Sequence, residues 1–204
     1  MKTFIASLLA ASAFATVNLI IDTDAGFDVD DIGALAVAHY YADQGRVNLL
    51  GTMHSTACDL GIAAVHVVNT YYGRGDLKIG AYKGDFGQDC NSQNTYLGDL
   101  INSYPNGNIR DSGDVQDVQD AYVDVLRAAE DKSVTIAAIG LPMNIRNLLR
   151  NYPDLFEQKV KEVYYMNGMY NFGCADGFLG NANDCYGAAQ EVQVKFPHTV
   201  REYF

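Results

Sequence analysis

The chain has little positive charge. It carries 14 Lys and Arg against 25 Asp and Glu in 204 residues, a formal net charge of −11. Such a surface repels phosphate backbones and anionic lipid, so we expect neither nucleic acid nor a membrane surface as a partner. Low-complexity tracts are also absent, and 49% of the residues are hydrophobic. These two features exclude a disordered chain and predict one sizeable core.

Long apolar runs are absent except near the N-terminus, from Phe4 to Phe14. This run follows a short positive start and is shorter than the roughly 20 residues of a membrane-spanning helix. The small residues Ala13 and Ala15 occupy the two positions at which a signal peptidase recognises its cleavage site. A buried N-terminal helix is the alternative, but the run has no polar face. We therefore expect a cleaved signal peptide over residues 1–15 and a secreted, soluble domain over residues 16–204.

Cysteine is scarce, with only Cys58, Cys90, Cys174 and Cys185. Export permits disulfides, and four cysteines allow three pairings. Cys174 and Cys185 bracket a stretch rich in Gly, Ala and Asn, so we expect a local bridge there. For Cys58 and Cys90, the alternative that they are free, buried thiols remains open. No Cys-x-x-Cys occurs and the four histidines are scattered, which argues against a zinc site.

Short apolar runs alternate with helical patterns along the rest of the chain. The expected strands are 17–21, 47–53, 77–81, 134–139 and 160–166, and the expected helices are 32–42, 61–72, 115–129 and 144–150. Residues 88–113, rich in Asn, Gly and Ser, are expected to be irregular. This order predicts an α/β fold with an open, mostly parallel, Rossmann-like sheet and helices on both faces. Ligands of such sheets bind at the carboxyl ends of the strands, here just after Ile21, Met53, Ile139 and Met166.

Five carboxylates follow the first expected strand within ten residues, at 22, 24, 28, 30 and 31. Two such charges about 5 Å apart repel each other by roughly 1 kcal/mol in water, and by more at lower dielectric. A cation would relieve this repulsion, and hard oxygen ligands select Ca²⁺ or Mg²⁺. A solvated loop that caps the helix beginning near Ile32 is the alternative. An EF-hand is excluded, because Gly33 stands where a bidentate Glu is expected.

The segment from Asp22 to Leu35 resembles the N-terminal signature of the inosine-uridine-preferring nucleoside hydrolases, in the form with two extra residues before the final Asp pair. The resemblance continues through residues 69–74, 79–84 and 134–144, and then through 163–168 and 171–172. It thus spans nearly all of the expected mature chain. It implies a nucleoside hydrolase-like fold and hydrolysis of the N-glycosidic bond of ribonucleosides to ribose and free base.

The resemblance also implies one Ca²⁺ and a set of site residues. Asp24 and Asp31 match the side-chain ligands of Ca²⁺, and Ile139 matches the residue that gives a backbone oxygen. Asp30 matches the general base that deprotonates the attacking water, whose pKa the metal lowers. The water attacks the anomeric carbon of an oxocarbenium-like ribosyl group as the base leaves.

The remaining matches concern the substrate, a small-molecule nucleoside. Asp22 matches a supporting carboxylate behind the Ca²⁺ ligands, and we count it among the substrate-binding residues. Met166 and Asn171 match positions that line the ribose pocket. After the second expected strand, where the family usually has Asn, this chain has His54 and Ser55, and Met169 stands where a ribose-binding Glu is common. A second copy of the chain, in a homo-oligomer, is left open as a partner.

The sequence ends at Phe204, before the part of the family that supplies a last Asp ligand and, in many members, a His that protonates the leaving base. His198 does not match that His. A fragment, a misplaced gene end and a degenerate paralogue are the three explanations. The alternative functions are a catalytically incomplete sugar- or Ca²⁺-binding protein and a metal-dependent hydrolase of another substrate on the same scaffold.

Overall fold

A seven-stranded sheet forms the centre of the computed structural model, which describes residues 15–26, 28–87, 90, 96–105, 107, 109–166, 191–192 and 195–203. The strands are β1 (Val17–Thr23), β2 (Val47–His54), β3 (Ile79–Ala81), β4 (Gln116–Asp117), β5 (Val134–Ala138), β6 (Val160–Tyr165) and β7 (Arg201–Tyr203). Their order is β4-β3-β2-β1-β5-β6-β7, and every pair of neighbours is parallel. The predicted open, parallel α/β sheet is confirmed.

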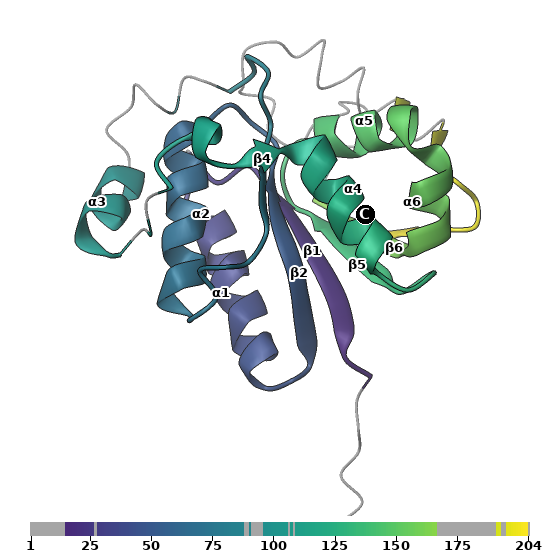
Figure 1. Cartoon of the computed structure of the whole chain (residues 1–204), viewed down its shortest axis with the longest axis horizontal. Helices are drawn as coiled ribbons and strands as arrows, with labels where there is room; N and C mark the ends of the chain where they lie inside the picture. The colour runs from purple at the N-terminus through teal and green to yellow at the C-terminus, as the bar shows by residue number, and fades with distance from the viewer. Residues whose placement is uncertain are drawn as a thin grey trace, which may run out of the picture.

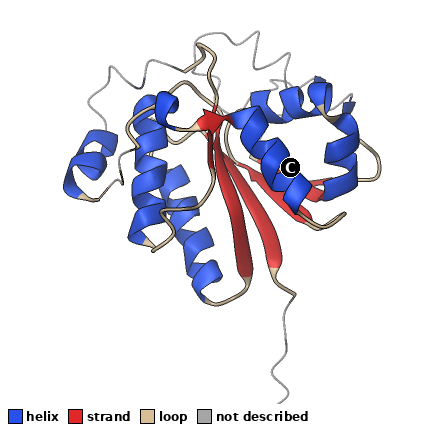
Figure 2. Ribbon diagram, viewed as in Figure 1, coloured by secondary structure: helices blue, strands red, loops and turns tan. Residues whose placement is uncertain are grey.

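The helices lie in two groups, with α1 to α3 on one side of the sheet and α4 to α6 on the other (Figures 1 and 2). They are α1 (Asp30–Asp43), α2 (Asp59–Tyr71), α3 (Tyr96–Ser103), α4 (Val118–Ala128), α5 (Met143–Asn151) and α6 (Pro153–Lys159). A short 3₁₀ turn, Ser112–Asp114, precedes β4. Among the helices that the structure describes, none is both long and apolar enough to cross a bilayer.

Each face of the sheet carries its own hydrophobic core. Ile20 packs into the cluster that contains Tyr122 of α4 and Phe156 of α6. Its neighbour Ile21 points the opposite way and packs with Leu35 of α1. Because successive residues of a strand face opposite sides, a strand covered on both faces is apolar at every position. The continuous apolar runs therefore predicted β1 and β5 well.

Residues 88–113 are not irregular throughout, because α3 lies inside this stretch and the 3₁₀ turn begins within it. Leu97 is fully buried, and Leu100 and Ile101 pack beside it against Ala64 of α2. These three apolar residues at helical spacing define the inner side of α3. The Asn, Gly and Ser around them hid this short pattern. The seven-residue α6 and the three-residue β7 were not predicted either.

A disulfide joins Cys58 to Cys90, with 5.7 Å between their Cα atoms. Both cysteines are buried, in the same cluster as Leu97. The alternative of free thiols at these two positions is therefore wrong. The expected bridge between Cys174 and Cys185 lies outside the described residues, as do residues 1–14 of the expected signal peptide.

Candidate functional site

The carboxyl ends of β1, β2 and β5 meet at one edge of the sheet. Asp22 pairs with Met53 of β2 on one side and with Ala138 of β5 on the other. Just beyond β2, the Ser55 amide donates to the Thr23 carbonyl at 2.8 Å. The Ser55 hydroxyl in turn accepts a hydrogen bond from the Leu141 amide at 3.0 Å. The three strand ends are thus bonded to one another, and the residues that follow them share one site.

A glycine after β5 permits a very close approach to β1. A Cβ atom built on Gly140 would lie 2.6 Å from the Thr23 carbonyl carbon and 2.7 Å from the Asp24 nitrogen. The amides of Ile139 and Gly140 both donate to the Asp22 carbonyl, at 2.8 and 3.0 Å. Ile139, the expected backbone ligand, therefore follows β5 directly beside the start of the acidic segment.

Asp22 lies beneath the acidic segment rather than on its surface. Its side chain is fully buried and accepts hydrogen bonds from the Tyr122 hydroxyl at 2.6 Å and the Asn144 amide at 3.1 Å. Burial raises the pKa of this carboxyl to about 7 despite the two donors. Asn144 also donates to the His54 carbonyl at 3.2 Å. Asp22 therefore connects β1 with β2, α4 and α5, which fits a supporting position.

Three other carboxylates converge at the start of α1. Asp28, Asp30 and Asp31 each offer an oxygen, and these oxygens lie within 4.8 Å of one another. Asp28 and Asp30 are exposed, whereas Asp31 is buried and accepts a hydrogen bond from the Thr23 hydroxyl at 2.5 Å. Burial, followed by the charges of Asp30 and Asp28, raises the pKa of Asp31 to about 6. The group is costly when fully ionised, so a cation would stabilise it.

The chemistry of this group fits a hard cation. Its donors are all carboxylate oxygens, with no His or Cys among them, which suits Ca²⁺ or Mg²⁺ rather than a soft metal. Asp24, an expected ligand, is half-buried, and its hydrogen bond with Asp31 lowers the pKa of the latter. The group of three converging carboxylates contains Asp28 rather than Asp24.

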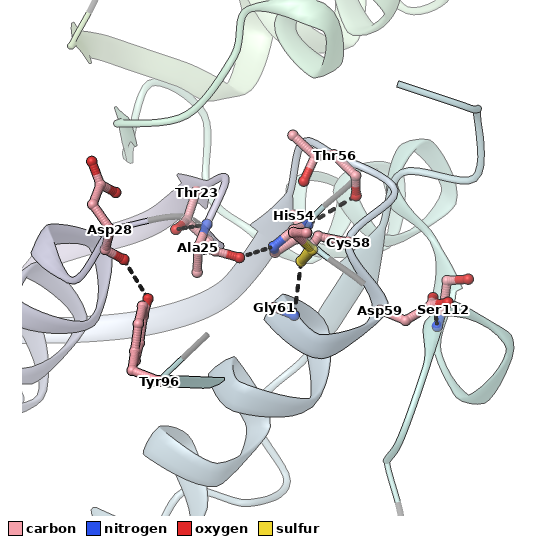
Figure 3. Close-up of a disulfide and its surroundings, with 11 residues drawn as sticks. Thr23, Ala25, Asp28, His54, Thr56, Cys58, Asp59, Gly61, Tyr96 and Ser112 are labelled. Atoms are coloured by element: carbon pink, nitrogen blue, oxygen red, sulfur yellow. Dashed lines mark hydrogen bonds between the residues drawn. A yellow bond between two sulfur atoms is a disulfide. The ribbon is translucent and has the colours of Figure 1, made fainter. Parts of the chain in front are cut away.

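His54 is the last residue of β2 and lies beside the acidic segment. Its ring is buried, with Nδ1 2.9 Å from the Thr56 carbonyl oxygen and Nε2 3.1 Å from the Ala25 carbonyl oxygen (Figure 3). Burial lowers the pKa of this histidine. Gly61 at the start of α2 leaves room for the ring, since a Cβ there would lie 2.5 Å from Nε2. His54 therefore joins the segments after β1 and β2.

Met166, one of the residues expected to line the ribose pocket, lies farther along the sheet than Asp22. Met166 follows β6, is 38% exposed, and donates its amide to the Ala138 carbonyl at 2.9 Å. It therefore sits at the same carboxyl edge as Ile139, with β5 between its own strand and β1. Asn171 lies outside the described residues.

Sequence reasoning missed three residues that contact these groups, namely Tyr96, Tyr122 and Asn144. Asp28 was counted in the acidic cluster but was not assigned as a ligand. Asn144 carried a usable signal, because it closely follows an expected strand end. Tyr122 lies in the expected helix 115–129, and its ring is in the core. Its hydroxyl reaches Asp22 across 100 positions of the chain, a contact that a helical pattern does not reveal.

The family described as inosine-uridine preferring nucleoside hydrolase matches residues 19–191. This match covers most of the chain, and the α/β sheet with an acidic cluster at its carboxyl edge agrees with it. The protein belongs to this family. None of the curated proteins compared with the sequence matches it.

Solved structures of two effector proteins have a similar fold. The type III effector XopQ, complexed with adenosine diphosphate ribose, is 17% identical, with a TM-score of 0.63 over 88% of this chain and 54% of that one. The effector XOO4466 is 15% identical, also with a TM-score of 0.63, over 88% of this chain and 53% of that one. The chain spans about half the length of both. At such identities the likeness shows the fold alone.

Proposed function

We propose that the protein hydrolyses the N-glycosidic bond of ribonucleosides, giving ribose and the free base. The convergence of Asp28, Asp30 and Asp31 at the carboxyl edge of the sheet supports this proposal most directly. These carboxylates lie in the segment that resembles the family's N-terminal signature, and the family match includes that segment.

Asp30 is the residue that we assign to proton transfer. It is exposed, and its carboxylate accepts a hydrogen bond from the Asp31 amide at 3.1 Å, which helps to orient it. As a general base it would take a proton from water as the water oxygen bonds to the anomeric carbon. The electrons of the broken C–N bond leave with the nucleobase, which takes up a proton.

A bound Ca²⁺ would lower the pKa of the attacking water and orient the ribose hydroxyls. We propose that Asp31, Asp24 and the Ile139 carbonyl hold it, by likeness to the family. The low exposure of Asp31 and its bond to Thr23 support this role, because a fixed carboxylate loses little freedom on binding. Met166 and Asn171 are proposed to line the ribose pocket.

Calorimetric titration of the purified protein with Ca²⁺, followed by a reducing-sugar assay on inosine and uridine, tests these proposals. Ca²⁺ binding with release of ribose supports the hydrolase. Ca²⁺ binding without release favours the alternative, a sugar- or Ca²⁺-binding protein without turnover. Absence of Ca²⁺ binding by the folded protein would contradict the cation site. Adenosine diphosphate ribose, the ligand in the XopQ structure, is a third compound to test because it also contains ribose.

We also propose that the protein is secreted after removal of residues 1–15. The disulfide between Cys58 and Cys90 supports this, because such bonds persist in oxidising compartments. Expression in a secreting host should give exported protein whose N-terminal residue is Thr16. Uncut protein retained inside the cell would contradict the proposal.

A further inference from the structure

Tyr96, the first residue of α3, reaches the acidic segment from a distant part of the chain. Its hydroxyl donates a hydrogen bond to the main-chain carbonyl of Asp28, 68 positions earlier (Figure 3). Asp28 is exposed and belongs to the group of three converging carboxylates. The bond therefore holds the main chain at Asp28, where the acidic segment becomes exposed to solvent.

The hydroxyl of Tyr96 is kept protonated by its surroundings. Partial burial and the charges of Asp31, Asp28, Asp30 and Asp24 raise the pKa of the phenol above its usual value. All four carboxylates are thus close enough to act on Tyr96. The donor that holds Asp28 stays intact throughout the pH range in which the carboxylates ionise.

Tyr96 packs against the cluster that contains the Cys58–Cys90 disulfide. Leu97, the next residue, is fully buried in one cluster with both cysteines and with Ala64 of α2. Cys58 also caps α2, since its sulfur accepts a hydrogen bond from the amide at position 61. The disulfide thus holds the start of α3 against the start of α2.

The acidic segment rests on the same disulfide. A Cβ built on Gly26 would lie 3.7 Å from the Cys58 sulfur and 3.8 Å from the Cys90 Cβ. The segment therefore has two contacts, with the disulfide at Gly26 and with the Tyr96 hydroxyl at the Asp28 carbonyl. Figure 3 shows the second of these.

We propose that Tyr96 is a positioning residue for the cation site. Its hydroxyl fixes the main chain at Asp28 so that the carboxylates of Asp28, Asp30 and Asp31 converge, and the Cys58–Cys90 disulfide keeps Tyr96 within reach. This inference rests on the proposed function in one respect, namely that the acidic group binds Ca²⁺. It adds a residue of α3 to a site that is otherwise built at strand ends, and it explains what holds the acidic segment between β1 and α1 in place.

The first test is Tyr96→Phe, which removes the hydroxyl and keeps the ring. Calorimetry should show Ca²⁺ binding weakened by about fivefold, the loss expected from one hydrogen bond. Tyr104→Phe is the matched control, because Tyr104 follows the other end of α3 and its ring contacts Tyr71 instead. It should leave Ca²⁺ affinity unchanged. Equal affinities in the wild type and Tyr96→Phe would overturn the proposal.

Hydrogen exchange of the peptide spanning residues 22–33, in Ca²⁺-free protein, separates this inference from the proposed function. Exchange should be faster in Tyr96→Phe than in the wild type or Tyr104→Phe, while peptides from β5 and α5 keep wild-type rates. This outcome would stand even if the wild type bound no Ca²⁺. Identical exchange in all three proteins would overturn the positioning role.

The double variant Cys58→Ala/Cys90→Ala tests the part played by the disulfide. Folded protein, checked by circular dichroism, should show the same faster exchange over residues 22–33 and weaker Ca²⁺ binding. Wild-type behaviour of both would show that Tyr96 acts without the disulfide and would overturn that half of the proposal. If the double variant does not fold, Tyr96→Phe decides the proposal alone.

Discussion

Asp30 and Asp31 are adjacent in the chain but stand in different environments. Asp31 is 5% exposed and is held by the Thr23 hydroxyl, whereas Asp30 is open to solvent. A buried, fixed carboxylate suits cation binding, and an exposed one beside it can exchange protons with water. The division of labour that the family resemblance implies is therefore reasonable on physical grounds.

Substitution of the two residues should separate turnover from cation binding. Asp30→Asn keeps an oxygen near the cation but cannot take a proton, so ribose release should fall by about 10²- to 10⁴-fold with Ca²⁺ affinity largely retained. Asp31→Ala removes an expected ligand and should weaken Ca²⁺ binding itself. Calorimetry and the reducing-sugar assay measure the two properties. Equal loss of both properties in both variants would contradict these roles.

From the raised pKa of the buried Asp22 carboxyl we expect the Ca²⁺-free protein to be less stable in mild alkali than in mild acid. Its pKa is about 7 in the folded protein against an ordinary 3.8. Between these values the folded state binds a proton that the unfolded state has released. The free energy of unfolding therefore falls as pH rises through this window, by about 3 kcal/mol from this residue between about pH 5 and about pH 8.

Urea denaturation with a chelator at about pH 5 and about pH 8 measures this difference. Asp22→Asn cannot ionise and still offers an oxygen to Tyr122, so the difference should be smaller in this variant. Part of the slope should remain, because the pKa of Asp31 is raised in the same direction. An unchanged slope in Asp22→Asn would show that Asp22 is not the source.

At the scale of elements, the close contact of β1 with the end of β5 depends on one glycine. In Gly140→Ala the new methyl would meet main-chain atoms of Thr23 and Asp24, which cannot move without disturbing the sheet. We expect a loss of about 1–3 kcal/mol or more in the free energy of unfolding, measured by urea denaturation.

Gly33→Ala is the matched control for that substitution. Gly33 lies in α1, and a Cβ built there has no neighbour within 4 Å. Alanine is a better helix former, so this variant should gain about 0.5–1 kcal/mol. If the two variants changed stability equally, the close approach at Gly140 would not be what limits that position.

The sequence predicted elements best where a single element carries its own pattern. β1 and β5 are covered on both faces, so their apolar runs predict them directly. The residues expected at strand ends, including Ile139 and Met166, lie at one edge of the sheet. Tyr96 was not predicted as a site residue, because α3 is short and lies in a stretch rich in Asn, Gly and Ser. Asp28 could not be assigned, because which carboxylates converge depends on the turns between β1 and α1.

At the scale of the whole molecule, the net charge of −11 favours the approach of cations over that of anions. This long-range attraction adds to the local charge of Asp28, Asp30 and Asp31. It acts through solvent, so dissolved salt screens it. The distance over which a charge is felt falls from about 20 Å to about 4 Å as salt rises from roughly 20 to 500 mM.

Ca²⁺ affinity should therefore weaken several-fold over that range of sodium chloride, as measured by calorimetry. A neutral nucleoside gains nothing from the field, so the affinity for uridine at saturating Ca²⁺ should stay nearly constant. Ca²⁺ affinity that is independent of salt would mean that only the immediate ligands attract the ion.

The central place of β1 has a consequence for how the protein is made. β1 is the first strand of the chain, yet one of its two neighbours is β5, and the Asn144 that bonds to Asp22 lies 122 positions later. During synthesis the acidic segment emerges early, while one edge of β1 remains unpaired until β5 arrives. Such long-range pairing slows folding and leaves intermediates open to association. The nascent protein therefore carries its carboxylates long before it can hold them in place.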